Sequence, residues 1–213
     1  VNEKTKIFYL CNPNNPTGTI VTKDDLQMVV DRLPEDVVLF IDEAYFEFAR
    51  VHQEYPDGLE ILKTRPRTIV LRTFAKVSGI AGLRVGYIIS DPEIITEVSK
   101  ASTVFSVNRL AQKAALAALD DEEHIEKSVA LARASLSRMM EYFDQRRWRY
   151  IKAAGNFIFV DVGTDTRKVF IDLQKKGVIV RPGFLWKWDH WLRISSGTME
   201  ETELLIEALD KVL

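Results

Sequence analysis

The sequence has little cysteine, little net charge and no long apolar run. Its 213 residues include a single cysteine, Cys11, so a disulfide framework is excluded. No apolar run approaches the roughly 20 residues that span a bilayer. The formal net charge is −2, without a basic stripe or an acidic tail, and the three histidines lack metal-ligand spacing. We therefore expect a cytoplasmic protein with no nucleic-acid partner, no membrane contact and no metal.

The first ninety residues contain four short apolar runs separated by helical patterns. Each run is rich in β-branched or aromatic residues and too short for a helix, which predicts a buried strand. The runs are Ile7–Cys11, Val37–Ile41, Thr68–Leu71 and Val85–Ile89. Between the first two, Thr22 is the expected N-cap of a helix. This strand–helix rhythm predicts an α/β fold with a mostly parallel sheet.

The rest of the sequence predicts a long helix and a smaller unit. From Glu122 to about Arg146, apolar residues recur every three or four positions. Later segments predict short strands (Phe157–Val162, Val178–Arg181, Leu192–Ser195) and two helices (Arg167–Lys175, Glu200–Leu213). We expect residues 1–120 to form part of a large domain, 121–148 a linking helix and 149–213 a small C-terminal α+β domain.

Three polar segments each follow a predicted strand, where ligands bind in doubly wound sheets. In residues 12–18, Asn-Pro-Asn-Asn-Pro-Thr-Gly, two prolines stiffen the chain and aim the side chain of Asn15. These are also ordinary turn residues, so a plain turn is an equal alternative. Asp42 ends an apolar strand, where a buried carboxylate pairs with a positive group or caps a turn. Tyr45 follows three residues later.

The third segment contains Lys76 and, eight residues later, Arg84, among glycines that let backbone approach a ligand. A lone lysine is usually a solvated surface residue. Here, however, the basic, acidic and amide side chains all follow strands of one predicted sheet. This combination favours a shared ligand site.

In this order, the three segments resemble fold-type I pyridoxal-phosphate (PLP) aminotransferases. Further segments resemble the histidinol-phosphate aminotransferase branch of that family, over the C-terminal two-thirds of such an enzyme. They are Asp42–Phe48, Ser78–Tyr87, Asn108–Gln112 and Leu192–Thr198. The resemblance implies an aspartate aminotransferase-like fold, with part of the PLP-binding large-domain sheet followed by the small domain.

The resemblance also implies roles in holding the cofactor. Lys76 would carry PLP and move a proton between the substrate Cα and the cofactor C4′. Asp42 would pair with the protonated ring nitrogen, and Asn15 and Tyr45 would donate hydrogen bonds to O3′. Ala75 departs from the serine that is frequent before this lysine, so the cofactor phosphate would lose one hydroxyl partner.

Other residues are implied to bind the phosphate and the substrate. Arg84 would grip the cofactor phosphate, supported by Thr73. Arg193 would bind the substrate α-carboxylate, with Asn156 nearby, unless it is a surface residue of an edge strand. Arg181 is implied at the far end of the substrate, where it would suit a phosphate. The tryptophans at 186, 188 and 191 either line that end or pack a hairpin.

The activity implied is transamination of histidinol phosphate with glutamate/2-oxoglutarate, in histidine biosynthesis. The partners would be an amino-acid or amino-alcohol phosphate, a 2-oxo acid and a second copy in a homodimer. The alternatives are an aromatic amino-acid aminotransferase, an amino-acid phosphate decarboxylase, and a non-catalytic module or inactive fragment. Because the sequence starts at Val1 without an initiator methionine, we expect a piece of a longer protein. The resemblance implies a phosphate-binding helix and several sheet strands before this segment, so we expect these 213 residues alone to bind PLP weakly.

Overall fold

The computed structural model describes residues 1–213, which divide into two compact units. The first unit comprises residues 1–14 and 20–125, and the second comprises 15–19 and 126–213. The short segment 15–19 therefore clusters with the second unit, although the chain on both sides of it belongs to the first. No helix combines the length and apolar character needed to cross a membrane.

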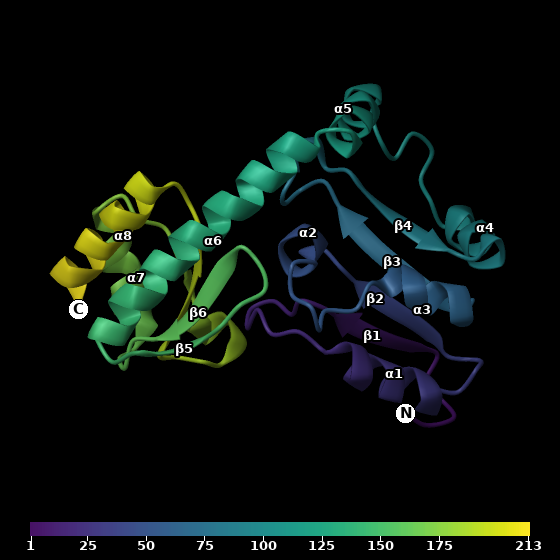
Figure 1. Ribbon diagram of the computed structural model, residues 1–213, viewed down its shortest axis with the longest axis horizontal. Helices are drawn as coiled ribbons and strands as arrows, with labels where there is room; N and C mark the ends of the chain where they lie inside the picture. The colour runs from purple at the N-terminus through teal and green to yellow at the C-terminus, as the bar shows by residue number, and fades with distance from the viewer. The chain divides into compact units, whose positions relative to one another are not determined.

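The first unit is built on a four-stranded sheet in the order β1-β2-β3-β4 (Figure 1). Its strands are β1 (Ile7–Cys11), β2 (Val38–Asp42), β3 (Thr68–Thr73) and β4 (Gly86–Ser90). The first three are parallel and β4 is antiparallel to β3, which confirms the mostly parallel sheet predicted from the sequence. The carboxyl ends of β1, β2 and β3 consequently meet at one edge, as the arrowheads in Figure 1 show.

Five α-helices lie wholly within the first unit. They are α1 (Lys23–Arg32), α2 (Phe46–Ala49), α3 (Gly58–Thr64), α4 (Pro92–Lys100) and α5 (Arg109–Leu119), with a 3-10 turn η1 at Ala81–Leu83. Helix α1 begins after the predicted N-cap, because the Thr22 hydroxyl accepts the N–H of Asp25 at 3.2 Å. The short helices α2 and α3 were not predicted, since neither is long enough to show a helical period.

Side-chain alternation gives the sheet of the first unit two different faces. Leu39 and Ile41 of β2 are fully buried in one core cluster with Leu26 of α1. Residues at the intervening positions, including Asp42, point to the opposite face. The run Ile7–Cys11 was predicted to be a buried strand. This is wrong for the face opposite Leu39 and Ile41, where Ile7 is 60% exposed. The reason is that β1 is an edge strand, paired with β2 alone.

The second unit is an α+β unit with an antiparallel sheet in the order β5-β6-β8-β7. Its strands are β5 (Arg149–Ile151), β6 (Phe157–Asp161), β7 (Arg181–Pro182) and β8 (Trp191–Ser195). Its helices are α6 (Glu122–Gln145), whose first four residues belong to the first unit, α7 (Thr166–Lys175) and α8 (Met199–Val212), with a 3-10 turn η2 at Gly183–Trp186. The strand expected over Val178–Arg181 is mostly wrong, because only Arg181 pairs, and β5 was not predicted.

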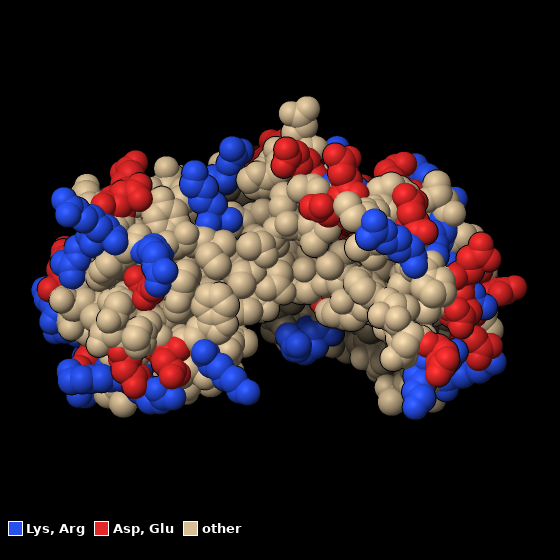
Figure 2. All heavy atoms as spheres, turned by 90° about the horizontal axis from the view of Figure 1, so that it is seen from below, with Lys and Arg blue, Asp and Glu red and all other residues tan.

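Helices α6, α7 and α8 pack against buried residues of β6 and β8 to form the core of the second unit. Phe143 of α6, Leu173 of α7 and Leu209 of α8 are all fully buried there. On the face of the second unit seen at the left of Figure 2, acidic and basic side chains are interspersed. Burial of apolar side chains, and not surface charge, therefore holds this unit together.

Two apolar residues of α7 test this core. Leu173→Ala is expected to lower the free energy of unfolding by about 2–5 kcal/mol, because it leaves a cavity at a fully buried position. The matched variant Ile171→Ala, on the 51% exposed side of the same helix, is expected to change it by under about 0.5 kcal/mol. Urea unfolding followed by circular dichroism measures both. Equal losses from the two variants would contradict the assigned packing.

Candidate functional site

Asp42 is the last residue of β2, at the edge where the parallel strands end. One of its carboxylate oxygens, Oδ1, accepts a hydrogen bond from the backbone N–H of Ala44 at 3.0 Å. Asp42 therefore caps the following turn, which was one of the two roles expected from the sequence. The other oxygen, Oδ2, accepts a short hydrogen bond from the phenol of Tyr9 on β1. The carboxylate is thus held at both oxygens, and the tyrosine was not predicted.

Tyr45 and Lys76 bring together the chain segments that follow β2 and β3. The Tyr45 side chain is buried, and the Nζ atom of Lys76 lies 5.1 Å from the centroid of its ring. An ammonium at this distance is attracted by the face of an aromatic ring. The segment after the lysine is also fixed, because the His124 ring donates a hydrogen bond of 3.0 Å to the Val77 carbonyl. Lys76 therefore lies in a defined turn.

Thr73 and Arg84 are held by hydrogen bonds within their own turns. The Thr73 hydroxyl accepts the N–H of Ala75 at 3.1 Å. Arg84 has a left-handed backbone, with φ of 55°, and its exposed guanidinium donates to the carbonyl of Ala81 at 2.9 Å.

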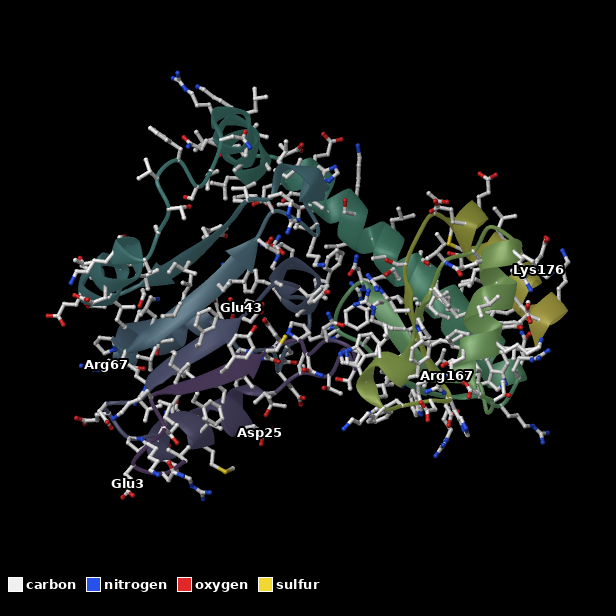
Figure 3. All side chains as sticks on the ribbon, turned by 180° about the vertical axis from the view of Figure 1, so that it is seen from behind. Glu3, Asp25, Glu43, Arg67, Arg167 and Lys176 are labelled. Atoms are coloured by element: carbon white, nitrogen blue, oxygen red, sulfur yellow. The ribbon has the colours of Figure 1, made fainter.

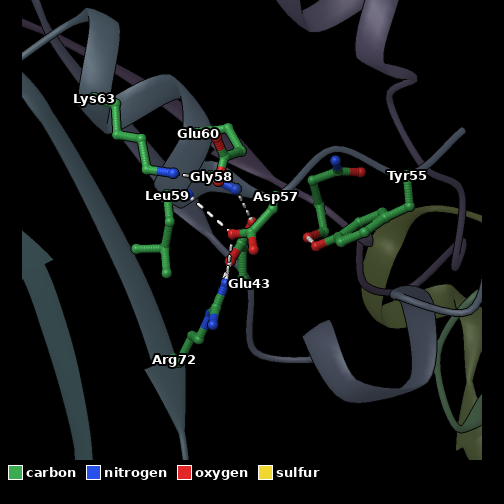
Figure 4. A network of polar contacts seen from close by, with 9 residues as sticks. Glu43, Tyr55, Asp57, Gly58, Leu59, Glu60, Lys63 and Arg72 are labelled. Atoms are coloured by element: carbon green, nitrogen blue, oxygen red, sulfur yellow. Dashed lines mark hydrogen bonds and ion pairs between the residues drawn. The ribbon is translucent and has the colours of Figure 1, made fainter.

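Glu43 forms a buried ion cluster that the sequence analysis missed (Figure 4). Its Oε2 accepts the Nε of Arg72, from β3, at 2.9 Å, and its Oε1 accepts the N–H of Gly58, at the start of α3, at 2.7 Å. Arg72 also pairs with Asp57 at 2.7 Å and lies 3.5 Å from the ring centroid of Phe46. The signal was available, because an arginine within an apolar strand needs a buried partner.

The carboxyl group of Glu43 is 1% exposed, and Figure 3 shows it inside the first unit while Asp25 and Arg67 lie at the periphery. Burial raises the pKa of Glu43 from its ordinary value of 4.5 to about 7, against the opposing charge of Arg72. A side chain at position 58 would also disturb it, since a Cβ there would lie 2.9 Å from Oε1. Gly58 is therefore required for this close approach.

In the second unit, the structure joins Asn15 to Arg193, two residues 178 positions apart in the chain. The Nη1 group of Arg193 donates to the Asn15 side-chain oxygen at 2.8 Å, and its guanidinium lies 5.0 Å from the ring centroid of Phe157. Gly18 lets this segment pack closely on Ala153. Its φ is +77°, and a Cβ at position 18 would lie 2.3 Å from the Cβ of Ala153. The proline-rich loop is thus docked rather than a plain turn.

Arg181 and Asn156 lie on either side of the strand that carries Arg193. Arg181 is paired directly opposite Arg193 in the β7–β8 ladder, so the two side chains leave the sheet on the same face. The backbone carbonyl of Asn156 accepts the N–H and the hydroxyl of Ser196 at 2.9 and 3.1 Å.

The tryptophans of the hairpin pack rather than stand apart. Phe159 of β6 is fully buried, and the rings of Trp191, Trp188 and Trp186 surround it with centroids 4.9, 5.5 and 6.2 Å away. The packing role weighed for these side chains is therefore present, against β6.

Comparison with known proteins places these residues in a family. The family model described as aminotransferase class I and II matches residues 1–209. The chain belongs to this family. All 213 residues align with histidinol-phosphate aminotransferase 2 of Carboxydothermus hydrogenoformans at 45% identity and with histidinol-phosphate aminotransferase of Caldicellulosiruptor saccharolyticus at 43%. The chain spans 59% of the length of each of these curated relatives.

Solved structures agree on the fold. The histidinol-phosphate aminotransferase of Sinorhizobium meliloti, in complex with pyridoxal-5'-phosphate, superposes with a TM-score of 0.89 at 30% identity, covering 97% of this chain and 56% of that one. The enzyme of the same name from Clostridium acetobutylicum gives 0.89 at 22% identity, covering 97% and 64%, and this likeness shows the fold alone. The predicted aminotransferase fold is thereby confirmed.

The raised pKa of Glu43 predicts a pH-dependent stability. A carboxyl group whose pKa is higher in the folded state binds more protons when folded, so its contribution falls as pH rises from about 4.5 to about 7. Glu43→Gln cannot ionise and should gain stability relative to the wild type across that window, by on the order of 1 kcal/mol. Urea unfolding at several pH values measures this difference.

The matched control is Glu60→Gln, since Glu60 forms an exposed ion pair with Lys63 at 2.7 Å. It is expected to change stability by less than about 0.5 kcal/mol. If the difference between wild type and Glu43→Gln stayed constant between pH 4 and 8, the burial effect on Glu43 would be wrong.

Proposed function

We propose that this chain provides PLP- and substrate-binding residues of an aminotransferase. The enzyme would exchange the amino group between histidinol phosphate and the pair glutamate/2-oxoglutarate. Relatives 45% and 43% identical are named histidinol-phosphate aminotransferases, and a similar solved structure contains pyridoxal-5'-phosphate. The observation that carries the proposal is the position of Lys76. Its Nζ lies 5.1 Å from the ring centroid of Tyr45, and Tyr45 follows Asp42 by three residues.

The side chains present fit PLP by their chemistry. Asp42 keeps acceptor capacity beyond its two hydrogen bonds, because each carboxylate oxygen has two lone pairs. This suits the protonated ring nitrogen of the cofactor. Lys76 offers a primary amine that is partly buried, in a fixed turn, and that can bond covalently to the cofactor aldehyde.

When bound, PLP supplies a ring that withdraws electrons from the substrate Cα. The Asp42 carboxylate would accept a charge-assisted hydrogen bond from the protonated ring nitrogen. This contact would keep the proton on that nitrogen. Tyr45 and Asn15 would donate to O3′ and orient the ring. Lys76 would hold the cofactor through its side-chain nitrogen, then take the proton from Cα and deliver it to C4′.

Arg84 and Thr73 retain donors for the cofactor phosphate. The guanidinium of Arg84 has five N–H groups, of which the Ala81 carbonyl takes one. The Thr73 hydroxyl accepts the N–H of Ala75 but can still donate its own proton to a phosphate oxygen. Since residue 75 is alanine, we propose that these two side chains provide most of this segment's grip on the phosphate.

The two arginines suit the anionic groups of the two proposed substrates. Arg193 would bind an α-carboxylate with two parallel N–H groups, with Asn156 beside it. Arg181, opposite Arg193 in the β7–β8 ladder, would bind a substrate phosphate. Arg193 would then bind the carboxylate of the amino-acid donor, and Arg181 would bind the phosphate of histidinol phosphate.

Covalent attachment tests the cofactor role. The full-length protein is mixed with PLP, reduced with borohydride and digested. We expect the PLP mass on the peptide that contains residue 76, and its loss together with the visible absorbance in Lys76→Ala, because the attaching amine is gone. Lys100→Ala, an exposed lysine of α4, is the control and should keep both. Unchanged labelling of Lys76→Ala would overturn the assignment, and a wild type without label would favour a non-catalytic module.

Substrate choice is tested at Arg181. Arg181→Ala should raise the KM for histidinol phosphate about tenfold or more, because a charge-assisted phosphate contact is lost. The KM for glutamate, which lacks a phosphate, should change little. Assays with aromatic amino acids and with amino-acid phosphates, scored for transamination or carbon dioxide release, separate the alternative activities. Equal effects on both substrates would contradict the phosphate role.

We also propose the larger organisation that the family suggests. Residues 1–120 would form part of the PLP-binding large domain, 121–148 a linking helix and 149–213 the small domain. We propose a homodimer located in the cytoplasm, where a sequence with a single cysteine suits the reducing conditions. Light scattering of the purified protein and cell fractionation test these two points.

A further inference from the structure

Tyr9 and Asp42 share one face of the first unit's sheet. In the parallel β1–β2 ladder, Tyr9 is paired with Phe40 and Cys11 with Asp42. Residues two apart point to the same face, so Phe40 and Asp42 project together on the side opposite Leu39 and Ile41. The ring of Tyr9 stacks on that of Phe40, with centroids 5.2 Å apart and planes inclined by 25°.

This stacking directs the Tyr9 hydroxyl toward Asp42. The phenol donates to Oδ2, while the backbone N–H of Ala44 donates to Oδ1. With a donor on each oxygen, the carboxyl group cannot rotate about its Cβ–Cγ bond without losing a hydrogen bond. The orientation of the Asp42 carboxylate is thus determined by β1 on one side and by the following turn on the other.

The environment keeps the phenol in its donating form. Burial, followed by the hydrogen bond and the negative charge of Asp42, raises the pKa of Tyr9 above its ordinary value. Cys11 is the other titratable group that acts on it. The tyrosine is still 57% exposed, so its ring contributes little to a core, and its hydroxyl contact is the feature left to explain.

We propose that Tyr9 is a positioning residue for PLP: it aims the Asp42 carboxylate at the ring nitrogen and shares the negative charge of that carboxylate. This inference rests on the proposed function, in which Asp42 is the partner of the ring nitrogen. Tyr9 contacts Asp42, so it would act on the cofactor through that carboxylate. Removing its hydroxyl should therefore change both how well PLP binds and how strongly the carboxylate acts on the ring.

Tyr9→Phe tests this in the full-length protein, because it retains the ring stacked on Phe40 and removes one oxygen. The dissociation constant of PLP, measured on cofactor-free protein by equilibrium dialysis, is expected to rise about three- to tenfold. The pH midpoint of the visible absorbance band of the loaded protein should move upward, because a carboxylate without the phenol concentrates its charge on the ring nitrogen. Neither measurement depends on turnover.

The matched control is Tyr150→Phe, which removes another tyrosine–aspartate hydrogen bond, of 3.1 Å to Asp144 in the second unit. It should leave both the affinity and the midpoint at the wild-type values. A double variant, Tyr9→Phe with Asp42→Asn, gives the decisive comparison. If Tyr9 acts through Asp42, adding Tyr9→Phe to Asp42→Asn should change the affinity less than twofold.

The outcomes separate this inference from the proposed function. A wild type that binds no PLP overturns both. If the wild type binds PLP but Tyr9→Phe matches it in affinity and midpoint, the role of Tyr9 alone is wrong. A full Tyr9→Phe effect that persists in the Asp42→Asn background, or a Tyr9→Phe protein that loses its fold by circular dichroism, shows a structural role and likewise overturns the inference.

Discussion

The buried ion cluster of Glu43 and Arg72 is the constraint on which the first unit's strand ends depend. A carboxylate this deeply buried is costly without partners, and here it has a guanidinium from β3 and a backbone N–H from the start of α3. The residues on either side are the ones proposed to handle the cofactor, since Asp42 precedes Glu43 and Thr73 follows Arg72. The cluster therefore ties the ends of these two strands to each other and to the start of α3.

Consecutive acidic residues in this segment have different surroundings because side chains alternate across a strand. Glu43 lies beside α3 and the apolar core, where Arg72 and the backbone N–H of Gly58 hold its carboxyl group. Asp42 points to the other face, where its neighbours are the Tyr9 phenol and the following turn. The same two-residue sequence thus provides one structural carboxylate and one that remains open to a ligand.

Much of this could be predicted from the sequence, and the failures have physical reasons. The four strands of the first unit, the Thr22 cap and the long helix α6 depend on local patterns, and the structure confirms them as elements. The contact between Asn15 and Arg193 could not be predicted, because no local pattern relates residues 178 positions apart. Tyr9 was missed because it was assigned to a buried run. Only the strand order, which leaves β1 at an edge, shows its hydroxyl free of the core and bonded to Asp42.

The two side chains proposed to face the ligands are held in different ways in the two units. The Asp42 carboxylate is fixed at both oxygens, by the Tyr9 phenol and by the backbone N–H of Ala44. The Arg193 guanidinium lies 5.0 Å from the ring centroid of Phe157 and donates one N–H to the Asn15 side chain at 2.8 Å. A guanidinium oriented in this way loses little side-chain freedom when it binds a carboxylate, which favours a two-pronged contact.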